Sequence, residues 1–169
     1  MLAAVLDRIS GMSDDAAIEA VKLLASDILA ITLDAELVSQ VTSARDAGEV
    51  SVPAALEAAT PHDAAELARF VLAVAAAAGR ASEVAQTLDA TTEPPPAQIE
   101  LINVLAFGLL RAVFTTWAKG ATGATTETTV TAGTDGSLIM HTVELTHTYA
   151  VGDAIAREAM SALDSLRSS

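Results

Sequence analysis

The sequence contains no cysteine, which excludes disulfide bonds, thiolate catalysis and thiolate metal sites together. Aromatic residues make up only 3% of the chain, whereas 37 of its 169 residues are alanine, so we expect a core of closely packed, alanine-rich helices. Basic residues are scarce as well: nine Lys and Arg stand against 22 Asp and Glu, a formal net charge of −13. A chain this acidic lacks the clustered cations that phosphate backbones require, so we expect no nucleic-acid partner.

Signatures of nucleotide binding and of hydrolysis are also missing. The sequence contains no GxGxxG, GxxxxGK or GxSxG motif. Gly120 and Gly123 form a GxxG, but they follow a predicted helix, whereas phosphate-binding loops precede one. We therefore expect no catalytic residues and no cofactor.

Two apolar runs could suggest a membrane segment. Residues 70–79 are about half as long as a helical span must be. Residues 101–118 are long enough, but Arg111 lies near their middle, where it costs roughly 2.5–3.5 kcal/mol on insertion. Residues 1–10 carry an acid and a base and lack the apolar run of a secretory signal. We therefore expect a cytoplasmic protein without a membrane span.

The N-terminal half carries the start and stop signals of short helices. We expect a helix over residues 1–10 ended by Gly11, a second opened by Ser13, and a third between Asp34 and Gly48. Apolar residues recur at helical spacing inside these segments. The pattern therefore predicts a helical N-terminal part.

The clearest helix start lies at Thr60. Thr60 has the features of an N-cap, Pro61 occupies the first helical position, and an acid stands at the third. We expect this helix to reach at least Ala78. It then either ends at Gly79 or continues past a weak point to about Leu88.

Three consecutive prolines mark a boundary within residues 91–98. Proline cannot continue a helix, and a run of prolines favours an extended connector. We divide the chain into an alanine-rich helical part, residues 1–90, and a C-terminal part, residues 99–169. The two form either two lobes or one compact domain.

A DG pair between two threonine- and valine-rich runs predicts one antiparallel β-hairpin over residues 126–147. A two-residue turn centred on Asp135 and Gly136 would place Val130 opposite His141. One face would then be apolar and the other rich in threonine. The residues of the predicted apolar face are Val130, Ala132, Ile139, His141, Val143 and Leu145. A final helix is expected from Asp153.

Histidines are the remaining candidates for a chemical site. We expect His141 either to pack half-buried against a helix or to act as a pH-sensitive group. On a continuous strand His141 and His147 lie roughly 20 Å apart, too far to share a metal ion. His62 lies at a helix start, where we expect it in solvent. The sequence therefore predicts no metal site.

These segments predict a mostly helical α+β fold, with five to seven helices and one antiparallel β-hairpin near the C-terminus. The apolar helix over residues 101–119 has more apolar circumference than its neighbours can readily cover. Phe107, Arg111 and Phe114 lie on one flank of it at i, i+4 and i+7, which makes them candidates for a partner interface. The alternative is that the N-terminal helices bury this flank.

The order of parts over residues 105–163 resembles a known module. An apolar helix ending in LLRAVFTTWAKG leads to a strand TTVTAG, a DG turn, a strand ending in VEL and a helix DAIAREAMSAL. This order is similar to that of effector-associated constant component modules of actinobacterial conflict systems. A single base, Lys119, follows Trp117, where those modules carry several. The resemblance implies a non-catalytic accessory module that docks on a partner effector or regulator.

Three classes of function follow from the sequence. We expect a non-catalytic protein–protein interaction or regulatory component, in a bacterial conflict or defence system. The alternative is a self-assembling structural protein, such as a subunit of a phage or phage-like particle. The third class is a small-molecule binder or an enzyme. The first two classes imply a protein partner or self-association.

Overall fold

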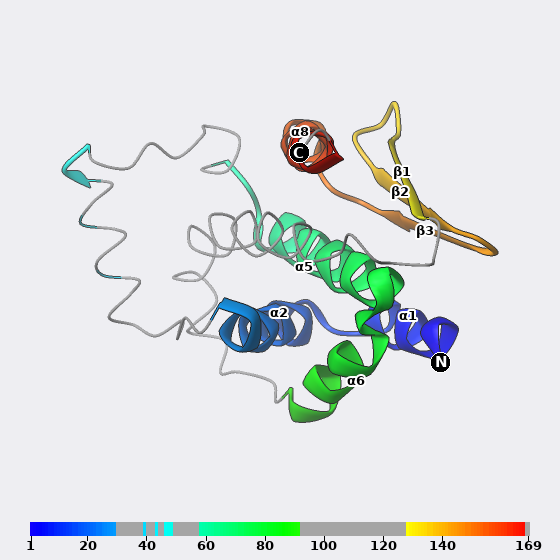
Figure 1. Cartoon of the computed structure of the whole chain (residues 1–169). Helices are drawn as coiled ribbons and strands as arrows, with labels where there is room; N and C mark the ends of the chain where they lie inside the picture. Colours follow the sequence, from blue (N-terminus) through cyan, green and yellow to red (C-terminus); the bar gives the residue numbers. More distant parts are fainter. Residues whose placement is uncertain (30–38, 40–42, 44–45, 49–57, 92–127, 168–169) are drawn as a thin grey trace.

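The computed structural model describes residues 1–29, 39, 43, 46–48, 58–91 and 128–167. Its elements, in chain order, are α1 (Leu2–Ser10), α2 (Asp14–Leu29), α5 (Pro61–Ala75), η1 (Ala76–Arg80), α6 (Ala81–Ala90), β1 (Thr128–Ala132), β2 (Leu138–Thr142), β3 (Leu145–Tyr149) and α8 (Asp153–Arg167) (Figure 1). Apart from residues 39, 43 and 46–48, the predicted helix between Asp34 and Gly48 lies outside the described residues. The prolines of the connector and the predicted apolar helix over residues 101–119 lie outside them as well.

The start signals read from the sequence are confirmed at two helices. Before α2, the Ser13 side chain accepts a hydrogen bond from the Ala16 amide at 3.3 Å. At α5, the Thr60 side chain accepts from the Asp63 amide, while the Asp63 side chain accepts from the Thr60 amide. This capping box satisfies amides that the first helical turn leaves without a partner.

The long helix changes direction at Gly79. Gly79 has φ +96°, which a helix cannot contain, and Ala78 also departs from helical geometry. The chain forms the short π-helical segment η1 there and then continues as α6. The predicted weak point is therefore a kink between two helices.

Helix α5 is the centre of the helical layer. It lies between α1, α2 and α6 on one side and the sheet with α8 on the other (Figure 1). Phe70, Leu72 and Ala68 of α5 have no exposed surface, and neither has Ala25 of α2. Small buried side chains allow helices to approach closely, as the alanine content predicted.

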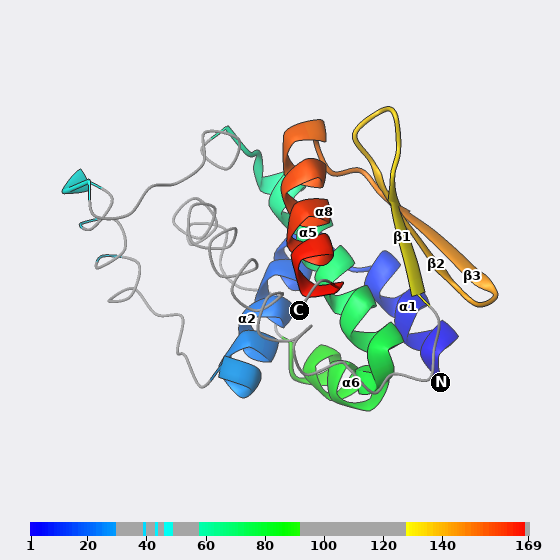
Figure 2. The same cartoon turned by 45° about the horizontal axis from the view of Figure 1, so that its top comes forward.

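The sheet has three strands in the order β1–β2–β3, all antiparallel (Figure 2). The prediction of a single hairpin was incomplete, because the chain turns at Val143 and Glu144 and returns as β3. The antiparallel pairing near the C-terminus is confirmed. The described chain is mostly helical, as expected.

The predicted register of the hairpin was wrong by one residue. The Gly133 amide donates to the Ser137 carbonyl at 2.7 Å, so the loop holds three residues rather than two. Gly136, with φ +79°, takes the left-handed position that ends such a loop. As a result Val130 pairs with Met140 instead of His141.

A shift of one residue exchanges the two faces of a strand. Leu138 and Met140 have no exposed surface, whereas His141 is exposed and Ile139 only half-buried. His141 is therefore not a packing histidine of the inner face. A hydrogen bond of 3.0 Å joins its Nδ1 to Thr146 Oγ1 on β3.

The inner face of the sheet joins the helical layer in one continuous core. Tyr149 of β3 meets Phe70 of α5 edge to face, with ring centroids 5.5 Å apart. α8 lies against β1, and its Ile155 and Ala156 are buried. α5 contacts β3 as well.

None of the described helices is both long and apolar enough to cross a membrane.

Candidate functional site

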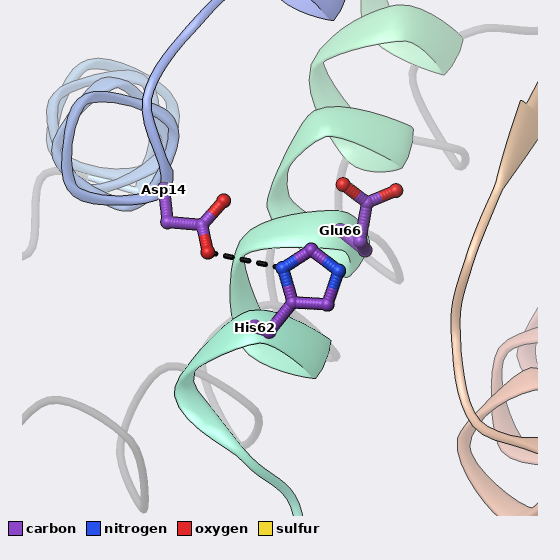
Figure 3. A group of neighbouring side chains, drawn as sticks. All are labelled: Asp14, His62 and Glu66. Carbon is purple, nitrogen blue, oxygen red and sulfur yellow. Dashed lines mark hydrogen bonds and ion pairs between the residues drawn. The ribbon is translucent and has the colours of Figure 1, made fainter.

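Four charged or titratable side chains meet between the first turn of α2 and the first three turns of α5. We call them the polar cluster: Asp14, His62, Glu66 and Arg69. The three on α5 are spaced i, i+4 and i+7, which places them on one face of the helix. Asp14 comes from the first turn of α2. Figure 3 shows the imidazole of His62 between the carboxylates of Asp14 and Glu66.

Arg69 is the buried centre of the polar cluster, with a relative exposure of only 7%. Its Nη2 donates to Asp14 Oδ1 at 2.6 Å and to the Met12 carbonyl at 2.8 Å, and its Nη1 donates to Glu66 Oε1. A buried guanidinium is tolerated only when it is paired and hydrogen-bonded in this way. Arg69 thereby joins α5 to the start of α2 and to the loop before it.

Glu66 connects the polar cluster to the sheet. Its Oε2 accepts a hydrogen bond of 3.1 Å from the amide of Ala150, the residue after β3. Burial, together with the charge of Glu66, raises the pKa of Tyr149 well above its usual range. The phenol therefore stays neutral, and the carboxylate of Glu66 holds the end of β3 against α5.

His62 and Asp14 form the exposed side of the polar cluster. His62 Nδ1 lies 3.0 Å from Asp14 Oδ2, and the two side chains are 60% and 40% exposed. The hydrogen bond to Asp14 raises the pKa of His62, against a smaller opposing effect of burial. Burial acts to raise the pKa of Asp14, but the hydrogen bonds from His62 and Arg69 together lower it.

Asp14, His62 and Glu66 are also the types of residue that bind a metal ion, and their ligand atoms all lie within 4.8 Å of one another. The contacts of the carboxylates argue against that use. Each of the four carboxylate oxygens already accepts from Arg69, His62 or the Ala150 amide. The guanidinium of Arg69 also supplies positive charge between the two carboxylates. The arrangement is that of an ion network which holds three segments together and can take up a proton at His62.

The sequence did not predict this network. It placed His62 in solvent at a helix start, which its exposure bears out, but the ion pair with Asp14 was missed. The spacing of His62, Glu66 and Arg69 on one helix face was visible in the sequence. Their partner Asp14, however, lies 48 residues before His62.

The second candidate site is the turn between β2 and β3, formed by Val143 and Glu144, which we call the β2–β3 tip. Val143 is 76% exposed. Among the described residues it is also the one non-glycine residue with a positive φ, at +29°. In two-residue hairpin turns this position favours glycine, because a β-branched side chain is strained there. The tip therefore combines an exposed apolar side chain with an unfavourable backbone conformation.

The structure does not place the interface residues predicted from the sequence. Phe107, Arg111 and Phe114 lie outside the described residues. His141 lies on the outer face of the sheet, opposite to the face that buries Tyr149. His147 pairs with Met140 on the inner-facing side, so His141 and His147 point to opposite faces of the sheet.

No family model matches the chain, and no curated protein or solved structure is significantly similar to it.

Proposed function

We propose that the chain is a non-catalytic protein-binding component with a regulatory role, and that the β2–β3 tip is a docking point for its partner. The conformation of Val143 carries this proposal. A β-branched residue at positive φ costs on the order of 1–3 kcal/mol, a cost that persists mainly at functional positions. Glycine at position 143 would relieve the strain, so an exposed valine there is better explained by a contact than by the fold.

The side chain of Val143 suits a protein contact. A valine that moves from water into a pocket gains about 1.5–3 kcal/mol, and its branched side chain has little rotamer entropy to lose. The net charge of −13 favours a partner with a basic surface around an apolar pocket, since opposite potentials speed association.

The sequence supplies a second surface for the same role. Phe107, Arg111 and Phe114 remain our candidates for a partner interface on the predicted 101–119 helix. The resemblance of residues 105–163 to accessory modules of conflict systems favours a cytoplasmic regulator in bacterial defence. In the alternative function, a self-assembling subunit of a phage-like particle, the β2–β3 tip would insert into a neighbouring copy of the chain.

Affinity capture tests the docking point. The tagged chain and its Val143→Asp variant are exposed to lysate of the source cells, and bound proteins are quantified by mass spectrometry. Aspartate tolerates positive φ, so the variant should fold while losing the apolar contact. We expect at least about tenfold less of the specific partner, the equivalent of losing one buried valine. Thr148→Asp, which adds the same charge at another exposed position of the sheet, should keep it.

Unchanged capture by Val143→Asp would remove the β2–β3 tip from the proposal. The mass in solution, measured by light scattering, separates the two protein-binding functions. A monomer favours the regulator, and a large homo-oligomer that Val143→Asp dissociates favours the assembling subunit. Zinc, magnesium or ATP should leave the melting temperature unchanged, whereas a ligand at 100 times its Kd adds about 2.7 kcal/mol and would argue for an enzyme or binder.

A further inference from the structure

The charges of the polar cluster do not balance when His62 is neutral. Asp14 and Glu66 carry two negative charges, and the buried Arg69 supplies one positive charge. Among the described residues, the charged groups that act on His62 are Asp14 from α2 and Glu66 and Arg69 from α5. A proton on the imidazole of His62 therefore completes the balance.

The geometry of the polar cluster places this proton at a junction between two helices. Arg69 is buried, with a relative exposure of 7%, and its guanidinium is held by Asp14, Glu66 and the Met12 carbonyl. It cannot readily move to follow a change in charge. His62 is instead exposed to solvent and contacts Asp14 Oδ2, the one oxygen of that carboxylate that Arg69 leaves to it.

We propose that Asp14 and His62 form a proton-operated clamp between the first turns of α2 and α5. The clamp is tight when the imidazole is protonated and looser when it is neutral. A charged imidazole donates a stronger hydrogen bond to a carboxylate than a neutral one. The neutral ring can still donate from Nδ1, so the contact weakens without being abolished. This clamp is independent of the β2–β3 tip and of any partner.

The pKa shifts give the clamp its working range. Because the pKa of His62 is raised above 6.5 in the folded chain, its contribution to stability is complete below about pH 6.5. That contribution is lost as the pH rises through the raised value. Because the pKa of Asp14 is lowered below 3.8, its contribution is present above that pH and lost on further acidification. The clamp is therefore tightest in mildly acidic solution and loosens as the pH rises through the raised pKa of His62.

Nuclear magnetic resonance of the full chain tests the clamp directly. The imidazole signals of His62, His141 and His147 are followed between pH 5 and 9. We expect His62 to titrate above pH 6.5, the ordinary value for histidine, and its midpoint to fall in Asp14→Asn. An unshifted midpoint in the native chain, or one that Asp14→Asn leaves raised, would overturn the proposal.

Hydrogen exchange measures the mechanical consequence. The Ala17 amide donates to the Ser13 carbonyl at 3.0 Å in α2, and the Ala64 amide donates to the Thr60 carbonyl at 3.1 Å in α5. After correction for intrinsic exchange, we expect their protection to be roughly twofold to fivefold higher at pH 6 than at pH 8, the range of exposed ion pairs. His62→Gln, which leaves Asp14 and Arg69 in place, should abolish the difference. The same difference in His62→Gln would show that another group controls these turns and would overturn the clamp.

Discussion

Both turns of the sheet contain a residue with positive φ, but this residue is glycine in one turn and valine in the other. Between β1 and β2 the residue with positive φ is Gly136, which is buried and lies against the start of α8. Between β2 and β3 it is Val143, which is exposed at the β2–β3 tip. In the first turn, glycine occupies the conformation that favours glycine, and the turn is part of the fold. In the second turn, a β-branched residue occupies such a conformation, and this is why we propose a function for it.

Replacing Gly136 should give the largest effect, because two costs add there. An added Cβ would lie 2.5 Å from the Asp153 backbone nitrogen, and φ is +79°. We expect Gly136→Ala to lower the free energy of unfolding by about 2–5 kcal/mol, from left-handed strain and overpacking together. Urea denaturation measures the loss.

Gly79 is the matched control for this prediction. Its φ is +96°, but nothing lies within 4 Å of an added Cβ. Gly79→Ala should therefore cost only about 1–2 kcal/mol, the conformational part alone. Equal losses of unfolding free energy in the two variants would show that crowding of the added Cβ against α8 adds nothing to the cost of Gly136→Ala.

Replacing Val143 should have a smaller effect of the opposite sign. Val143→Gly removes strain of about 1–3 kcal/mol and adds the chain entropy of glycine, about 0.5–1 kcal/mol, so a net gain of about 1 kcal/mol is expected. Thr148→Gly in β3, where no positive φ is relieved, should instead lose about 0.5–1 kcal/mol. If Val143→Gly is destabilised like Thr148→Gly, the two turns do not differ as we describe.

The smallest effect concerns the side chain that supports the first turn. Asp135 Oδ1 accepts from the Ser137 amide at 3.1 Å and from the Ser137 hydroxyl at 2.6 Å. The hydrogen bonds from Ser137 lower the pKa of Asp135 below 3.8, so this support is present above that pH and lost as the pH falls through the lowered value. Asp135→Asn should lower the melting temperature slightly at pH 7, and the difference from the native chain should shrink as the pH falls through the lowered pKa of Asp135. A loss that does not change with pH would show that the charge is not involved.

Local signals in the sequence were sufficient for two helix starts and for the irregularity at Gly79. The capping box of Thr60 depends on residues only a few positions away and was predicted, and Gly79 was predicted either to end the helix or to weaken it. The DG pair likewise predicted a turn. Whether that turn holds two or three residues is not encoded locally, because Gly136 packs on Asp153, and strands β2 and β3 lie between these two residues in the chain. The register, and with it the face of His141, therefore could not be predicted.

The third strand and the polar cluster were missed for related reasons. The turn between β2 and β3 consists of Val143 and Glu144, and neither is a residue type that favours turns, such as glycine, proline or asparagine. The sequence therefore gives no turn signal there. The polar cluster depends on α2 and α5 packing together, which brings Asp14 to His62. Functional positions are where local preference and tertiary structure are expected to conflict.

We propose that Val143 is retained at the β2–β3 tip because it binds a partner, although its conformation destabilises the fold. A series at this position, Val143→Thr, Val143→Ala, Val143→Asn and Val143→Gly, tests it when stability and affinity for the captured partner, or for a second copy of the chain, are measured on the same samples. We predict that Asn and Gly give the most stable and the weakest-binding proteins, so that the free energy of unfolding rises as affinity falls. Affinity that stays constant across the series, or that falls together with stability, would contradict the account.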